Sequence, residues 1–128
     1  MEKLVIDGDN DRPYIYLDKE FGIYRIRGCS LPENVLEVYT PVLDWLREYA
    51  EDPNPEMNFE FDFDYLNTAS SNMVMRIIDA LINIRKNQSG VQIKWFYRHG
   101  DIDMRDLGLE MLEDTKCTFK LIQKDPVD

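Results

Sequence analysis

The sequence predicts a two-layer α/β fold in which a mixed sheet of about five strands carries its helices mainly on one face. Segments with the period of a strand alternate with segments with the period of a helix, which indicates strand–helix–strand units and parallel neighbouring strands. The predicted strands alternate apolar and polar residues, whereas strands covered by helices on both faces are apolar throughout. Because 44% of the 128 residues are hydrophobic, we expect one domain over residues 1–128 with its own core.

Three short strands are predicted in the first third of the chain. They cover Leu4 to Ile6, Tyr14 to Leu17 and Ile23 to Arg27, and turn-rich segments separate them. We expect the second and third strands to pair as a hairpin that closes around Gly22.

A first helix is predicted from residues 30–33 onward. Ser30 is expected to cap it, and Pro32 suits its first turn, where the missing N–H would have no partner in any case. Its apolar stripe consists of Val35, Val38, Tyr39, Val42, Leu46 and Tyr49. Pro41 removes a main-chain hydrogen bond, so we expect a kink there, and the segment 52–55 ends the helix.

The next strand has the plainest alternation in the chain. One side of it consists of Phe59, Phe61 and Phe63, and the other side of Glu60, Asp62 and Asp64. One face of this strand is therefore predicted to be wet.

Two helices and two strands complete the predicted fold. After a loop at 65–71, a second helix carries Met73, Ile77, Leu81 and Ile84 on one side and ends in a loop at 86–90. An alternating strand covers 91–98, a third helix begins near Ile102, and a last strand lies around 117–123.

Charge and cysteine content argue against several classes of function. The formal net charge of −10 opposes binding to nucleic acid, because contacts to phosphates need clustered Lys and Arg. Cys29 and Cys117 are far apart and offer neither a disulfide framework nor a thiolate metal site. No apolar run approaches the ~20 residues of a membrane span, and the N-terminus lacks a secretory pattern. We therefore expect a cytoplasmic protein without membrane, metal or cofactor binding.

Function is expected at one edge of the sheet. The loops at 28–34, 64–72 and 98–103 all follow carboxyl ends of predicted strands and should gather there. Within the second loop, Asn, Thr and Ser side chains suit the N-cap of the next helix, which is the plain interpretation. A hydroxyl at a helix start also suits phosphorylation, because the helix dipole and free N–H groups stabilise a phosphate. The two interpretations are compatible.

No catalytic site is predicted. Asp62 and Asp64 resemble the DxD start of haloacid-dehalogenase-type phosphatases, so a small carboxylate-dependent phosphatase or hydrolase is the alternative function. Such enzymes need a larger domain and downstream Lys and Asp elements, and the wet side of a strand explains these carboxylates better. Asp101, Asp103 and Asp106 suit the start of the third helix better than a weak site for a divalent cation, and His99 is the only histidine.

Three stretches of the chain resemble the SiaC family of bacterial regulatory phosphoproteins. The first stretch contains Gly28, Ser30, Pro32, Glu33, Asn34, Tyr39, Pro41, Leu43, Trp45 and Leu46, spaced as in the family segment GxSxPENxxxxYxPxLxWL. The other two are Tyr65, Leu66, Asn67 and Thr68, which match its Y(L/F)NTSS loop, and Trp95, Phe96 and Tyr97, which resemble its WxY strand. Ala69 stands where the family often has serine.

The resemblance implies a fold like that of SpoIIAA-like and STAS-like anti-sigma-factor antagonists, and a signalling role by partner switching without catalysis. A protein kinase is expected to phosphorylate Thr68, and a PP2C-type phosphatase to restore it. The unmodified form is expected to bind a diguanylate cyclase and so to promote cyclic di-GMP production and biofilm growth. A purely structural adaptor, in which the loop only caps the second helix, is a further alternative.

The predicted switch has three groups of residues. Thr68 is the phosphoacceptor, while Asn67, Ser70 and Ser71 shape the loop. The predicted partner contacts are Leu66, Met73, Met104, Pro32, Glu33 and Asn34. A phosphate is expected to weaken binding because it adds charge to an edge already rich in carboxylates, which are those of Asp62, Asp64, Asp101 and Asp103.

Overall fold

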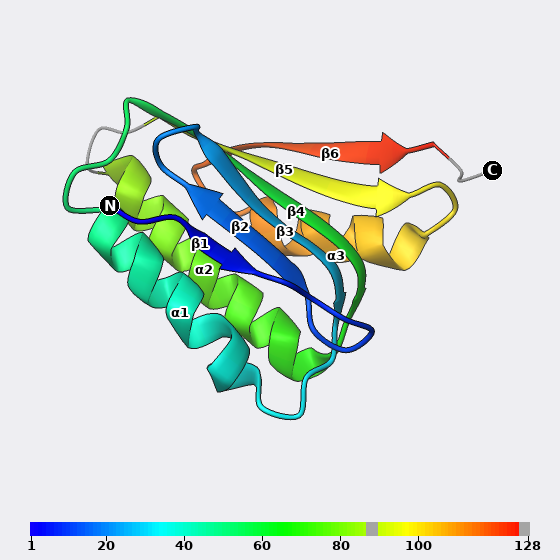
Figure 1. Cartoon of the computed structure of the whole chain (residues 1–128). Coiled ribbons are helices and arrows are strands. Elements are labelled where there is room, and N and C mark those ends of the chain that lie inside the picture. Colours follow the sequence, from blue (N-terminus) through cyan, green and yellow to red (C-terminus); the bar gives the residue numbers. More distant parts are fainter. Residues whose placement is uncertain (87–89, 126–128) are drawn as a thin grey trace.

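The computed structural model describes residues 1–86 and 90–125, which form two layers (Figure 1). The strands in these ranges are β1 (Leu4–Ile6), β2 (Tyr14–Asp18), β3 (Ile23–Ser30), β4 (Glu56–Leu66), β5 (Gly90–Arg98) and β6 (Thr118–Lys124). The helices there are α1 (Val35–Tyr49), α2 (Thr68–Lys86) and α3 (Ile102–Leu112). The predicted fold class is confirmed, with a 6-stranded sheet in the described part of the chain where about five strands were expected.

The strands lie in the sheet in the same order as in the sequence. β1, β2 and β3 are antiparallel neighbours, whereas β3, β4, β5 and β6 are parallel. Each parallel step needs a crossover, which α1, α2 and α3 supply in turn. Right-handed crossovers that all step in one direction place every helix on the same face, so the opposite face of the sheet is left uncovered (Figure 1).

The core lies between the sheet and the helices. Phe59, Phe61 and Phe63 of β4 are buried, while the intervening Glu60 and Asp62 are only half-buried, so the predicted alternation is confirmed. The helices contribute their predicted stripes, namely Val38, Tyr39, Val42, Leu46 and Tyr49 of α1 and Met73, Ile77, Leu81 and Ile84 of α2. No helix in the described ranges is both long and apolar enough to cross a lipid bilayer.

The start of α1 differs from the prediction. β3 continues to Ser30 through a bulge at Gly28, where φ is 101°, and α1 begins only at Val35. The Asn34 side chain accepts the amide hydrogen of Glu37 at 3.3 Å and is the N-cap. The prediction that Ser30 caps this helix is therefore wrong, since its hydroxyl is buried and bonded elsewhere. Pro41 lies inside α1, as predicted.

The connection between β4 and α2 is shorter than predicted. A loop was expected at 65–71, but β4 extends to Leu66 and α2 begins at Thr68, so Asn67 alone connects them. The four-residue run 68–71 forms the first turn of the helix instead of a loop. Most of the loop predicted at 86–90 falls on residues 87–89, which lie outside the described ranges.

Candidate functional site

Asn67 holds the turn that joins β4 to α2. Its amide donates a 3.0 Å hydrogen bond to the carbonyl oxygen of Ser30, at the end of the neighbouring strand β3. Its side-chain Oδ1 accepts the Ser70 amide at 2.8 Å, and its carbonyl oxygen accepts the Ser71 amide at 2.9 Å. These bonds are those of an N-cap residue, and they fix Thr68 as the first residue of the helix.

The hydroxyl residues of this turn differ sharply in exposure. Thr68 is exposed and Ser71 is half-buried, whereas Ser70 is 0% exposed. Phosphorylation needs a hydroxyl that an enzyme can reach. Of the predicted residues, Thr68 therefore meets this requirement best, and Ser70 does not meet it in this conformation.

Ser70 belongs instead to a buried chain of hydroxyl groups beneath the turn. The Ser30 hydroxyl donates to the Ser70 Oγ at 2.8 Å and lies 2.6 Å from the Tyr39 hydroxyl. These residues come from β3, α2 and α1 respectively, so the chain joins the elements that surround the turn. Burial raises the pKa of Tyr39 to about 12, although its hydrogen bonds to the serines lower it in part.

The start of α2 favours an added anion. No acidic residue lies in its first turn. Within the described residues, the amides of Thr68 and Ala69 have no acceptor in hydrogen-bond range. Free amides and the positive end of the helix dipole both stabilise a phosphate, so modification of Thr68 is compatible with the fold.

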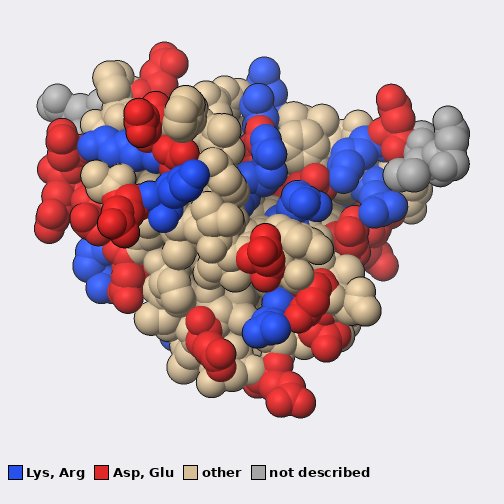
Figure 2. Space-filling model, viewed as in Figure 1, with Lys and Arg blue, Asp and Glu red and all other residues tan. Residues whose placement is uncertain are grey.

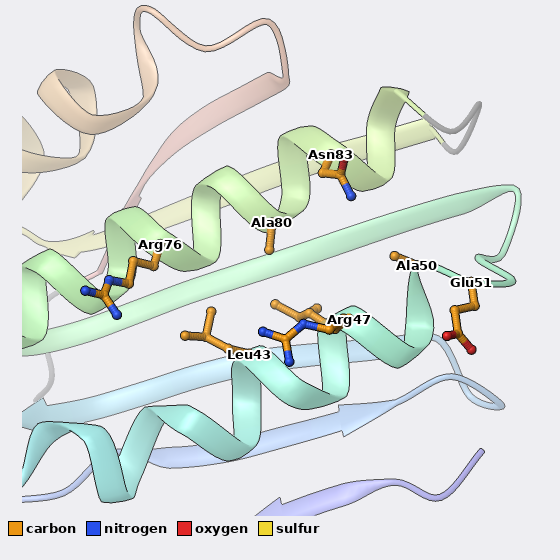
Figure 3. Close-up of a pocket in the computed structure, with 8 residues that line it drawn as sticks. Leu43, Arg47, Ala50, Glu51, Arg76, Ala80 and Asn83 are labelled. Carbon is orange, nitrogen blue, oxygen red and sulfur yellow. The ribbon is translucent and has the colours of Figure 1, made fainter.

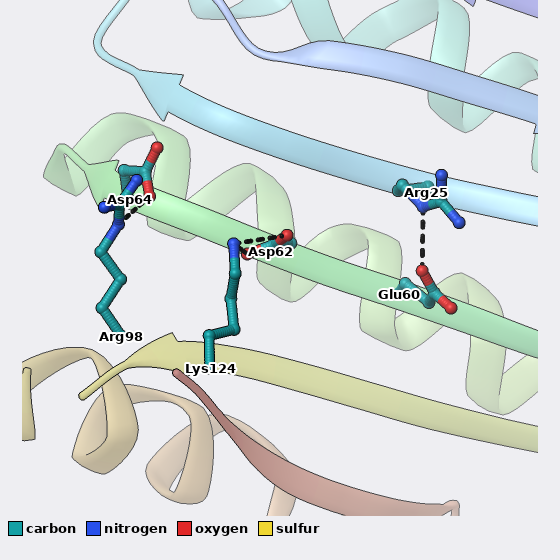
Figure 4. A network of polar contacts seen from close by, with 6 residues as sticks. All are labelled: Arg25, Glu60, Asp62, Asp64, Arg98 and Lys124. Atoms are coloured by element: carbon teal, nitrogen blue, oxygen red, sulfur yellow. Dashed lines mark hydrogen bonds and ion pairs between the residues drawn. The ribbon is translucent and has the colours of Figure 1, made fainter. Parts of the chain in front are cut away.

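Glu60, Asp62 and Asp64 of β4 lie on the uncovered face of the sheet and are engaged in ion pairs (Figure 4). The Asp64 Oδ1 is 2.7 Å from Arg98 Nε, and it raises the pKa of that arginine. Both oxygens of Asp62 bind Lys124 Nζ, at 3.0 and 3.1 Å. Because β6 and β4 are not neighbours, this lysine reaches across β5.

These pairs give Asp62 and Asp64 a structural role. They link β4 to β5 and β6, and neither carboxylate lies among the residues of a described cavity. Each of these two carboxylates at the predicted acidic edge is matched by a cation. Within residues 1–86 and 90–125, no three His, Cys, Asp or Glu side chains are grouped so as to hold a metal ion.

Comparison with known proteins identifies the family. The model of the SiaC family regulatory phosphoproteins matches residues 6–124. The chain belongs to the SiaC family. An uncharacterized protein of Pseudomonas aeruginosa (strain UCBPP-PA14) is 30% identical over 119 residues, which are 93% of this chain and 93% of that protein.

Solved SiaC structures agree with this assignment. The crystal structure of apo-SiaC from Pseudomonas aeruginosa is 29% identical, with a TM-score of 0.88 over 95% of this chain and 99% of that chain. A chain in the crystal structure of diguanylate cyclase SiaD in complex with its activator SiaC, from the same organism, is 28% identical. Its TM-score is 0.89 over 94% of this chain and 99% of that chain.

Two of the partner contacts predicted for this SiaC-family protein lie in its core. Met73 is 3% exposed in α2, and Met104 is 7% exposed in α3. The Met104 carbonyl oxygen also accepts the indole N–H of buried Trp95 at 3.0 Å. Periodicity placed both methionines on apolar stripes, and these stripes face the sheet, so the two side chains are not a docking surface.

The other predicted contacts remain near the surface. Leu66 and Pro32 are half-buried, and Glu33 and Asn34 are exposed. Residues 32–34 border a shallow cavity of about 310 Å³, whose other wall is the turn at 9–12. The Leu31 amide donates to the Asp11 carbonyl oxygen at 2.8 Å and holds the two walls together.

The residues at the ends of β5 and β6 have local partners. The Asp101 side chain accepts the Met104 amide at 3.0 Å and caps α3, and Asp103 lies in the first turn. His99 is exposed, and its Nδ1 is 3.0 Å from Gln123 Nε2. The interpretation of these aspartates as helix-start residues is confirmed.

One surface feature of the SiaC-family fold was not predicted. A groove of about 420 Å³ lies between α1 and α2 (Figure 3). The residues that line it are Leu43, Leu46, Arg47, Ala50, Glu51, Arg76, Ala80 and Asn83. The small side chains of Ala50 and Ala80 leave this space between the helices. Periodicity could place these residues on helices but not next to one another.

Proposed function

We propose that this SiaC-family protein is a non-catalytic regulator switched by reversible phosphorylation of Thr68. The observation that carries the proposal is the contrast within one turn, where Thr68 is exposed and Ser70 is fully buried. The free amides of the first turn of α2 support it, because they favour a phosphate at this position. A protein kinase and a PP2C-type phosphatase set the state of Thr68.

The partner of the unmodified form is a diguanylate cyclase or a similar signalling protein. The support is the structural similarity to SiaC, which is the activator of the cyclase SiaD in the complex described above. In this proposal the bound cyclase makes more cyclic di-GMP, which promotes biofilm growth. The protein itself contributes contacts and no chemistry.

The switch acts through the desolvation of a dianion. A phosphorylated threonine carries nearly two negative charges. A partner that docks on it must remove water from the phosphate, which costs free energy unless the partner supplies cations. A penalty of about 3 kcal/mol reduces affinity by more than a hundredfold. Asp62 and Asp64 are not needed for this effect, because Arg98 and Lys124 already match them.

Mass spectrometry after incubation with the cognate kinase and ATP tests the acceptor. We expect one phosphate on Thr68 in the wild-type protein and none in Thr68→Val, which keeps the size of the side chain. Ser71→Ala is the matched control and should be labelled as the wild type is. Labelling of Thr68→Val at Ser70 or Ser71 would contradict the assignment.

Binding to the cyclase tests the switch. Thr68→Ala should bind constitutively, and Thr68→Asp should bind at least tenfold more weakly while its melting temperature stays within a few degrees. A structural adaptor predicts that Thr68→Ser and Thr68→Asp bind equally well, since Asn67 caps α2 and both residues suit the first turn of a helix. Equal affinity of these two variants would therefore reject the switch.

A further inference from the structure

The uncovered face of the sheet has the opposite charge to the chain as a whole. The net charge of the chain is −10. The outward positions of β3 to β6 carry the bases Arg25, Arg27, Lys94, Arg98, Lys120 and Lys124, and the acids Glu56, Glu60, Asp62 and Asp64. Lys and Arg side chains accordingly gather in the upper half of the view in Figure 2, over the strands. Most acidic residues lie elsewhere on the molecule.

Most acids of this face are already paired. Arg25 pairs with Glu60 at 2.9 Å, Lys124 with Asp62 at 3.0 Å and Arg98 with Asp64 at 2.7 Å (Figure 4). Among the described residues, Arg27, Lys94 and Lys120 form no ion pair. The positive charge of these side chains is therefore available to a ligand.

Lys94 and Lys120 lie directly opposite each other on neighbouring strands. Adjacent strands are about 4.8 Å apart, and like charges in this position destabilise a sheet. Glu60 is the neighbour of Lys94 on the other side, but its carboxylate is bonded to Arg25 instead. The protein thus keeps a pair of lysines that it does not neutralise, and an external anion placed between them would relieve the repulsion.

Arg27 presents a second cation two strands away from Lys94. Its guanidinium lies 4.4 Å from the centroid of the Tyr14 ring, which holds it against the surface. Its cross-strand neighbour Asp62 directs both oxygens to Lys124. A shallow cavity of about 210 Å³ beside Arg27 is smaller than the roughly 300 Å³ of ordinary small-molecule sites.

We propose that this face binds an acidic polypeptide segment of a second protein, with carboxylates at the Lys94–Lys120 pair and at Arg27. These cations are spread over four strands, a span of about 14 Å, which suits an extended chain better than a compact ligand. A long polyanion or an anionic membrane would also meet the negative charge on the rest of the molecule, whereas a short acidic segment can contact these cations and end there. Arg27, Lys94 and Lys120 lie on strands and not in the turn that begins α2, so we expect binding that does not depend on the state of Thr68.

Titration of the full-length protein with a fluorescent deca-glutamate peptide tests this proposal. We expect binding that weakens as salt is added, and chemical-shift changes in NMR spectra at Lys94, Lys120 and Arg27. Lys94→Glu/Lys120→Glu should weaken binding about tenfold or more. The matched control, Arg47→Glu/Arg76→Glu, makes the same charge change in the groove between α1 and α2 and should bind as the wild type does. The milder variant Lys94→Gln/Lys120→Gln removes both charges without reversing them, and it replaces the first variant if the charge reversal unfolds the protein. It should melt no lower than the wild type.

Three results would overturn the proposal. The first is equal loss of binding in both charge-reversal variants, which would indicate a general charge effect. The second is the absence of shift changes along β5 and β6. The third is tighter binding of a single-stranded oligonucleotide or of vesicles with phosphatidylserine than of the peptide, which would assign the surface to another class of ligand. Loss of binding in Thr68→Asp would refute the independence of the two surfaces and leave the phosphorylation switch itself intact.

Discussion

Gly108 of α3 lies so close to Trp95 of β5 that a Cβ atom at position 108 would overlap the Cδ1 and Nε1 atoms of the indole. Trp95 is fully buried and donates its N–H to the carbonyl oxygen of Met104, so its ring cannot move aside without losing that bond. The helix can dock on this ring only because residue 108 has no side chain.

Gly108→Ala is therefore expected to destabilise the protein. In an exposed helix the same change stabilises by roughly 1 kcal/mol, because alanine is the better helix former. Here the overlap with Trp95 should reverse the sign and lower the free energy of unfolding by about 1–3 kcal/mol. Urea denaturation measures this difference, with Leu109→Ala on the exposed side of α3 as the control. An unfolding midpoint above that of the wild type would contradict the packing described here.

Tyr39→Phe is expected to weaken the buried hydroxyl chain without opening a cavity. The Ser30 and Ser70 hydroxyls keep their 2.8 Å bond, so the variant should lose about 1 kcal/mol of stability. Hydrogen exchange of the Ser70 and Ser71 amides, which are the hydrogen-bonded ones in this turn, should become faster, because the chain ties the turn to α1. Unchanged exchange together with an unchanged unfolding midpoint would show that the tyrosine hydroxyl contributes nothing.

Stability is expected to fall in alkaline solution through the same residue. Burial raises the pKa of Tyr39 to about 12 in the folded protein from its ordinary value of 10.0, so the unfolded chain loses its proton first as the pH rises. The contribution is complete below pH 10 and is lost between about pH 10 and 12, for a total of about 3 kcal/mol. Burial and its hydrogen bond to Tyr24 also raise the pKa of Tyr49. Tyr49 therefore adds to the loss of protein stability at alkaline pH. The free energy of unfolding should be measured against pH for the wild type and for Tyr39→Phe. The difference between the two curves gives the contribution of Tyr39, and parallel curves would show that Tyr39 contributes nothing to the pH dependence.

Asp62→Asn/Asp64→Asn is expected to change stability little and function not at all. The ion pairs of these residues are partly exposed, so each contributes about 1 kcal/mol or less. Phosphorylation of Thr68 and binding to the cyclase should match the wild type. The phosphatase alternative instead predicts turnover of a generic phosphoester, such as p-nitrophenyl phosphate, by the wild type and its loss in this variant. That outcome would overturn the non-catalytic assignment.

The layers of the fold could be predicted because apolar residues recur with a period of two along a single strand and of about 3.6 along a single helix. The alternation of Phe59, Phe61 and Phe63 with polar residues indicates a strand with one buried face, and these three side chains are buried in the structure. The role of Ser30 was missed, because its partners Tyr39 and Ser70 are 9 and 40 residues away and nothing local distinguishes a buried hydroxyl from a capping one. Met104 was predicted to contact a partner for a similar reason, since its place in the core depends on where α3 packs on β5.

The candidate site was predicted in part. Local sequence pointed to the hydroxyl residues of this turn, and the family resemblance singled out Thr68, which the structure places exposed at the start of α2. The ion pairs of Asp62 and Asp64 were not foreseen, because they depend on strand register across β4, β5 and β6. The Lys94–Lys120 pair required the same information, since these residues are far apart in the chain and meet only in the sheet.

Phosphorylation of Thr68 is expected to leave the fold as stable as before or slightly more stable. The phosphate would lie at the positive end of the α2 dipole, beside free amides and with no acidic residue in the first turn. Such an arrangement contributes about 0.3–1 kcal/mol at low ionic strength and less in salt. Calorimetric melting of the phosphorylated and unmodified proteins at low and high salt measures this difference, with Asn67→Ala, which removes the cap, as the variant expected to melt lower. A phosphorylated protein that melts well below the unmodified one would mean that the switch works by unfolding the turn, whereas equal or higher melting temperatures leave repulsion of the docked partner as the mechanism.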